Sequence, residues 1–137
     1  MKRFLLPLLA FAAMVAKAAD YNIVSYGAVN DTTKLSTAAV QKAIDDCSAA
    51  GGGRVVVPTG NYKIGTIILK SNVHMHLEQG ATLYGSTDLK DYLPLKTDYV
   101  SLRTQTETIQ LIFADKASNV VIDGFGTIDG RGRSFKK

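Results

Sequence analysis

The sequence predicts an all-β solenoid, a parallel β-helix whose first coil is capped by one α-helix. Three observations lead to this prediction. One segment with helical periodicity, early in the chain, is followed by eight short β-rich segments. No further amphipathic helix is predicted among them, which excludes a βαβ fold. The block at 71–85 returns at 118–130, and each copy follows an apolar segment. If the polar, proline-containing segment 87–108 is a loop inserted into one turn, the repeat is roughly 25 residues, as in stacked solenoid coils.

The first 18 of the 137 residues are predicted to be a secretory signal peptide. Lys2 and Arg3 precede an apolar run over 4–16, and a small-x-small pattern ends at Ala18. The run is too short to cross a bilayer. We therefore expect residues 19–137 to form one exported domain, periplasmic or extracellular, with no membrane association after cleavage. The formal net charge of +4 falls close to neutral without the signal, so no nucleic-acid partner is expected.

Residues 21–51 are predicted to form a short strand over 21–28, a turn over 30–33 and the capping helix over 36–47. Ser36 is the predicted N-cap, because its hydroxyl can accept an amide of the first turn. Gly51 provides the left-handed residue that follows the helix. Cys47 lies on the apolar stripe of the helix, where packing explains it, and a single cysteine excludes an internal disulfide. The helix would cover the apolar face that a first coil leaves open.

The rest of the chain is predicted to consist of short strands. They are 54–57, 62–64, 66–69, 73–78, 82–84, 109–114, 120–123 and 127–129. Along 73–78, alternate residues beginning with Val73 would face the core and those beginning with His74 would face outward. Asn72 and Asn119 precede strands at equivalent positions, where asparagine can adopt a turn conformation and stack on its equivalent in the next coil.

Several blocks resemble the opening of the pectinase-type right-handed β-helices. They are YGAVND at 26–31, AVQKAID at 39–45 and GGGRVVVPTGNY at 51–62. The blocks at 65–73, 77–83, 119–124 and 126–130 narrow the resemblance to glycoside hydrolase family 28, the polygalacturonases, over essentially the whole mature chain. This resemblance implies inverting hydrolysis of α-1,4 galacturonosyl bonds in pectin or polygalacturonate, by aspartates on central coils and without a cofactor.

The catalytic signatures of that family are absent. These are Asn-Thr-Asp, Asp-Asp after Gly or Gln, Gly-His-Gly and Arg-Ile-Lys, and none occurs in this chain. We therefore expect an N-terminal part of such an enzyme, truncated after the first few coils and inactive alone. Two alternatives remain open, a pectate lyase-type β-helix and a non-catalytic exported β-helix such as an adhesin or tail fibre.

No residue of this chain is assigned a catalytic, cofactor-binding or metal-binding role. An inverting glycosidase needs two carboxyl groups about 6.5–9.5 Å apart. Asp45 and Asp46 are neighbours that point about 100° apart around a helix. Asp123 and Asp129 flank a glycine-rich turn, and capping of the turn amides explains both.

A histidine pair is the one pattern that suggests a metal. His74 and His76 point the same way from one strand, and His-x-His can bind zinc if a third ligand is found. Glu78 is the next residue on that face. The outward polar face of a solenoid predicts the same pattern without a metal, so none is expected.

Overall fold

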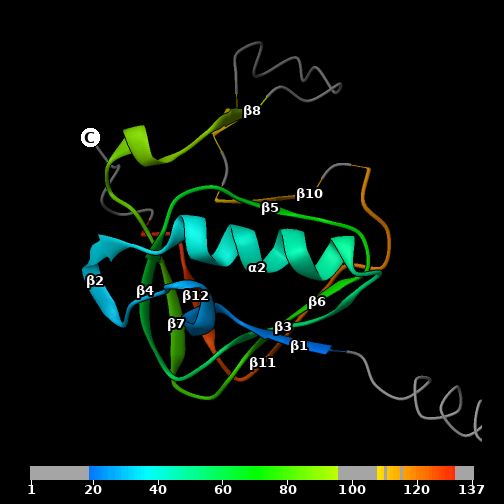
Figure 1. Cartoon of the computed structure of the whole chain (residues 1–137). Coiled ribbons are helices and arrows are strands. Elements are labelled where there is room, and N and C mark those ends of the chain that lie inside the picture. Colours follow the sequence, from blue (N-terminus) through cyan, green and yellow to red (C-terminus); the bar gives the residue numbers. More distant parts are fainter. Residues whose placement is uncertain (1–18, 96–107, 110, 115, 132–137) are drawn as a thin grey trace, which may run out of the picture.

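The computed structural model describes residues 19–95, 108–109, 111–114 and 116–131, and the predicted signal peptide lies outside them. It shows the predicted parallel β-helix with its capping helix. Figure 1 looks roughly along the solenoid, with strands on three sides and helix α2 (Thr37–Ala49) across the front. No helix among the described residues combines the length and the apolar character needed to span a membrane.

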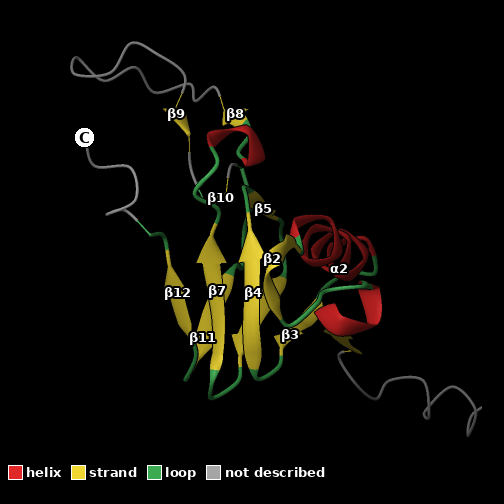
Figure 2. Ribbon diagram, turned by 90° about the vertical axis from the view of Figure 1, so that its left-hand side faces the viewer, coloured by secondary structure: helices red, strands yellow, loops and turns green. Residues whose placement is uncertain are grey.

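Three parallel sheets are formed by the described residues. The first contains β1 (Ala19–Asn22), β3 (Gly53–Val57), β6 (Val73–Leu77) and β11 (Val121–Gly124) in that order. The second contains β2 (Asp31–Leu35), β4 (Gly60–Ile64), β7 (Ala81–Gly85) and β12 (Thr127–Asp129), seen side by side in Figure 2. The third pairs β5 (Ile67–Leu69) with β10 (Ile112–Ala114).

The segment predicted as an inserted loop carries its own small elements. They are the 3-10 helix η3 (Leu89–Asp91) and an antiparallel pair, β8 (Pro94–Leu95) with β9 (Thr108–Ile109). Gly53 pairs with Val73 and Gly60 with Ala81, so an uninterrupted coil is shorter than the 25 residues expected. Ser71 and Ser118 occupy equivalent positions 47 residues apart. Because one coil is shorter than expected, the inserted segment between them is longer than the predicted 87–108.

The start of the chain departs from the prediction in two places. The strand predicted over 21–28 ends at Asn22, because the Asn22 carboxamide accepts the Val24 amide at 2.9 Å and begins the 3-10 helix η2 (Ile23–Tyr26). Residues 30–33 are not a simple turn, since Asp31 already pairs with Tyr62 at the start of β2. A local turn signal does not anticipate a partner strand further along the chain.

The capping helix is confirmed, with α2 ending two residues later than predicted. Its buried face consists of Ala39, Val40, Ala43, Ile44 and Cys47. Burial raises the pKa of the Cys47 thiol, which fits a packed rather than a reactive cysteine. Gly51 is left-handed, as predicted, with φ of 97°. Ser36 is the N-cap residue but makes no cap hydrogen bond, because its hydroxyl instead accepts the Val29 amide at 3.1 Å.

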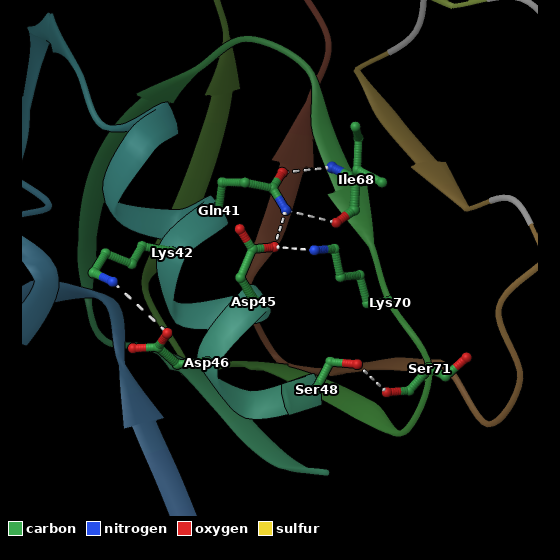
Figure 3. Close-up of polar contacts among 8 residues, drawn as sticks. All are labelled: Gln41, Lys42, Asp45, Asp46, Ser48, Ile68, Lys70 and Ser71. Carbon is green, nitrogen blue, oxygen red and sulfur yellow. Dashed lines mark hydrogen bonds and ion pairs between the residues drawn. The ribbon is translucent and has the colours of Figure 1, made fainter. Parts of the chain in front are cut away.

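The side chain of Gln41 fastens α2 to the edge of β5 (Figure 3). Its Oε1 accepts the Ile68 amide at 2.8 Å, and its Nε2 donates to the Ile68 carbonyl at 2.9 Å. Nε2 also donates to Asp45 at 2.9 Å, and Asp45 pairs with the Lys70 ammonium at 2.9 Å. Near the end of the helix, the Ser48 hydroxyl donates to the Ser71 carbonyl. One edge of β5 has no neighbouring strand among the described residues, and the backbone amide and carbonyl of Ile68 on that edge are hydrogen-bonded by Gln41 of α2 instead.

The predicted asparagine stack is confirmed. Asn72 and Asn119 are both left-handed, with φ of 67° and 57°. The side-chain Nδ2 of Asn119 donates to the side-chain Oδ1 of Asn72 at 3.1 Å, so the two turns are joined across successive coils. The same two turns are joined again where the Ser118 amide donates to the Ser71 hydroxyl at 3.0 Å.

Candidate functional site

The outward face of β6 and β11 brings together the two histidines and one aspartate, here called the His–Asp cluster (His74, His76 and Asp123). Val73, Met75 and Leu77 of β6 are buried, so the residues between them face outward as predicted. Asp123 of β11 pairs in register with His76, which places its carboxylate on the same face. The cluster therefore joins side chains 47 residues apart in sequence.

A single carboxylate oxygen lies at the centre of the cluster. Asp123 Oδ1 is 2.8 Å from His76 Nδ1, within hydrogen-bond geometry. It is also 2.8 Å from His74 Nε2, but that nitrogen is buried and makes no hydrogen bond to any described residue. The two imidazole rings meet edge to face, with centroids 6.1 Å apart. The hydrogen bond from His76, with His74 beside it, lowers the pKa of Asp123.

Asp123 and Asp129 were both expected to cap the glycine-rich turn between them, and neither carboxylate accepts an amide of that turn among the described residues. The oxygen of Asp123 faces the histidines, because the coil register sets it beside them. Asp129 instead caps the turn that follows it, accepting the Arg131 amide at 2.9 Å. Glu78, the next residue on the outward face predicted from the sequence, lies after the end of β6 and outside the cluster.

An ion pair lies beside the cluster on the same sheet. Arg54 is next to His74 in the register of β3 and β6, and its guanidinium makes two hydrogen bonds to Asp20, at 2.9 and 3.2 Å. This contact lowers the pKa of Asp20 and raises that of Arg54. The positive charge of Arg54 is thereby balanced locally.

Every aspartate that the structure describes has a local partner. Asp31 accepts from Thr33, Asp45 from Gln41 and Lys70, Asp46 from Tyr26, Asp88 from Lys90 and Asp91 from Ser86. Asp20, Asp123 and Asp129 have the partners given above. Asp45 and Asp46, excluded as a catalytic pair from their spacing, form two separate contacts (Figure 3). Each of these carboxylates thus takes part in at least one local structural contact.

A groove of about 340 Å³ runs beside β5, below the end of the capping helix. It is lined by Ser48, by 68–71 and by Lys116 and Ala117. The lining contains two lysines and no carboxylate, and the charge of Lys70 is already compensated by Asp45. The groove can receive a polar or anionic group, but it offers no acid–base pair for hydrolysis.

The sequence matches the family model of rhamnogalacturonase A/epimerase, pectate lyase-like proteins over residues 21–134. It is 44% identical over 119 residues to the exo-poly-alpha-D-galacturonosidase of Dickeya chrysanthemi, covering 81% of this chain and 19% of that protein. The structure aligns with the family 28 exopolygalacturonase of Yersinia enterocolitica with a TM-score of 0.74 and 36% identity, covering 84% of this chain and 21% of that one.

A shorter match links the chain to enzymes on another polymer. It is 44% identical over 64 residues to the mannuronan C5-epimerase AlgE1 of Azotobacter vinelandii, covering 41% of this chain and 5% of that protein. The chain spans about a fifth of the length of either polygalacturonase. The resemblance to glycoside hydrolase family 28 indicated by the sequence blocks is confirmed by these two matches.

Proposed function

Because this chain belongs to the rhamnogalacturonase A/epimerase, pectate lyase-like family, we propose that it forms the capped first coils of an exported glycoside hydrolase acting on pectin. The reaction would be hydrolysis of α-1,4 galacturonosyl bonds in polygalacturonate, with inversion. The observation that carries this proposal is the 44% identity to an exo-poly-alpha-D-galacturonosidase over most of the chain. The first coils would hold the fold, and catalysis would depend on carboxylates outside the described residues.

The carboxyl chemistry of the described residues supports that division of roles. An inverting glycosidase needs one carboxyl group with a raised pKa, to protonate the leaving oxygen, and one free carboxylate to activate water. The pKa is lowered for Asp20, Asp31, Asp45 and Asp123. Local hydrogen bonds or ion pairs favour the ionised form of each. These residues are suited to holding structure.

The last described coil offers a surface on which a further coil would stack. Ile122 and Ile128 are 41% and 38% exposed, and Phe125 is 84% exposed. Their counterparts one coil earlier, such as Met75 and Leu83, are fully buried. In a solenoid each coil is stabilised by its neighbours, so stacking of a further coil would bury this surface.

A uronate epimerase is the second candidate, favoured by the 64-residue match to a mannuronan C5-epimerase. The match covers less than half of the chain, so we place it after the hydrolase. The two candidates differ in substrate and product. A hydrolase shortens the polymer and creates reducing ends, whereas an epimerase leaves its length unchanged.

The test compares the 137-residue chain with the product of its complete genomic reading frame, on polygalacturonate and on polymannuronate. We expect the longer product to release reducing ends from polygalacturonate, and the chain alone to release none above the blank. Reducing ends released by the chain alone, and lost in an Asp123→Asn or Asp45→Asn variant, would contradict the proposal that the described aspartates serve structure and not catalysis. If the longer product leaves polygalacturonate uncleaved and epimerises polymannuronate, the second candidate is favoured.

Export is tested on the secreted product. We expect cleavage between Ala18 and Ala19, because the next bond would have Lys17 at its −3 position and is a poorer match to the small-x-small rule. Mass spectrometry of the mature N-terminus gives the answer. A product that keeps residues 1–18, or that stays in the cytoplasm, contradicts the proposed export.

A further inference from the structure

The His–Asp cluster has the donor atoms of a transition-metal site. His74 and His76 each offer one imidazole nitrogen, and Asp123 offers one carboxylate oxygen, with all three atoms within 4.8 Å of one another. Two imidazoles with one carboxylate are a ligand set that zinc accepts in proteins, with a water or another ligand in the fourth position. The three side chains are 39%, 28% and 49% exposed, so the cluster lies at the surface, although His74 Nε2 itself is covered until a neighbouring side chain rotates away.

The present spacing is close to what a tetrahedral ion needs. Bonds of about 2.0–2.1 Å to nitrogen and oxygen place neighbouring ligand atoms about 3.3 Å apart. The two histidine nitrogens are each 2.8 Å from Asp123 Oδ1. To bind an ion, these two contacts would open by about half an ångström, and the two nitrogens, which lie within 4.8 Å of each other, would also come to about 3.3 Å. Rotation of the partly exposed side chains can supply this change.

The nitrogen of His74 already faces the shared carboxylate. His74 Nε2 is buried and lies 2.8 Å from Asp123 Oδ1, at an angle outside hydrogen-bond geometry. A metal ion between the three donors would bind this nitrogen directly.

The neighbouring charges permit a cation. The guanidinium of Arg54, which is next to His74 in the register of β3 and β6, is held by Asp20 at 2.9 Å. Asp20 and Glu78 add negative charge near Arg54.

We infer that His74, His76 and Asp123 form a site for a divalent transition-metal ion of the zinc type, which joins β6 to β11 across two successive coils. Nothing in this inference depends on the proposed hydrolase activity. Imidazole ligands favour zinc and its borderline neighbours over calcium or magnesium, which prefer oxygen donors. Because the site joins two coils, a bound ion would stabilise the folded chain.

The test uses the untagged chain, stripped of metal with a chelator and titrated with Zn²⁺ by calorimetry. Titration with Co²⁺ provides a second probe, because its visible absorption reports tetrahedral coordination. We expect one equivalent to bind saturably and the thermal midpoint to rise with Zn²⁺ concentration. His74→Gln, His76→Gln and Asp123→Asn should each weaken binding at least about 10-fold, since even outer-shell replacements cost 10–100-fold.

Glu78→Gln is the matched control, because Glu78 is an acidic residue near the cluster but outside it. It should bind Zn²⁺ within about twofold of the parent chain. All variants should show the parent's circular dichroism and urea midpoint in chelator, since the replaced side chains are partly exposed. Absence of saturable Zn²⁺ and Co²⁺ binding by the parent chain overturns the inference. Unchanged affinity in Asp123→Asn, or an equal loss in Glu78→Gln, overturns the assigned ligand set.

Discussion

The contact between Gln41 and Ile68 gives the sharpest stability prediction, because a side-chain amide there takes the place of a neighbouring strand. The third sheet contains only β5 and β10 among the described residues, so one edge of β5 faces α2. Gln41 accepts the Ile68 amide at 2.8 Å and donates to its carbonyl at 2.9 Å. A net contribution of about 0.5–1.5 kcal/mol for each hydrogen bond gives about 1–3 kcal/mol for the pair.

Gln41→Met keeps the length of the side chain and removes both bonds, so it should lower the free energy of unfolding by that amount in urea melts. Gln41→Glu should be worse, because a carboxylate cannot donate to the Ile68 carbonyl and would repel Asp45. Lys42→Ala on the same helix is the control, since its 3.7 Å ion pair is exposed and contributes under about 1 kcal/mol. Hydrogen exchange should show faster exchange at the Ile68 amide in Gln41→Met. Unchanged stability together with unchanged exchange at that amide would refute the reasoning.

Three further predictions concern the cap and the coil turns. Ile44→Asp removes a fully buried side chain and introduces a charge, and should lower stability in urea melts by at least about 3–5 kcal/mol, whereas Ala38→Asp on the exposed side should stay within about 0.5 kcal/mol. Asn72→Ala removes the 3.1 Å hydrogen bond to Asn119 and places alanine at a φ of 67°, so it should lower the free energy of unfolding by about 1–3 kcal/mol. Asn72→Gly should recover the share of this loss that comes from the left-handed backbone, but not the share from the hydrogen bond. Burial would raise the pKa of Asp45, but hydrogen bonds from Lys70 and Gln41 outweigh it and lower the pKa, so its stabilisation is present above about pH 4 and is lost on acidification. Asp45→Asn should reduce the loss of unfolding free energy between about pH 5 and 3, and an unaltered pH profile of stability would contradict this prediction.

Local periodicity was enough to predict most of the fold. The stripe containing Val40 and Ile44 predicted the capping helix, and alternation along β6 predicted which side chains are buried. Both patterns arise from the geometry of one element and its burial, so a single sequence contains them. The left-handed asparagines were also predictable, because asparagine tolerates that conformation better than most residues.

Features that depend on the pairing of distant segments were not predictable in the same way. The short strand β2 was interpreted as a turn, because its pairing with β4 is set by the fold and not by its own composition. Asp123 was assigned to its own turn, although its partners are His74 and His76. Their alignment is set by the register of β11 on β6, and sequence spacing alone overestimated the length of one coil.

The stacking of coils separates the residues that hold this fold from those that can acquire chemistry. Inward residues such as Met75 are fixed by packing against neighbouring coils, so a substitution there changes stability. Outward residues such as His74 are constrained mainly by their neighbours in register on adjacent coils. A slip of one residue between β11 and β6 would turn Asp123 toward the core and Ile122 away from it, so the buried face holds the register that assembles the His–Asp cluster. The inward residues therefore determine which outward residues can act together, and the inserted segment can change in length without dispersing the cluster.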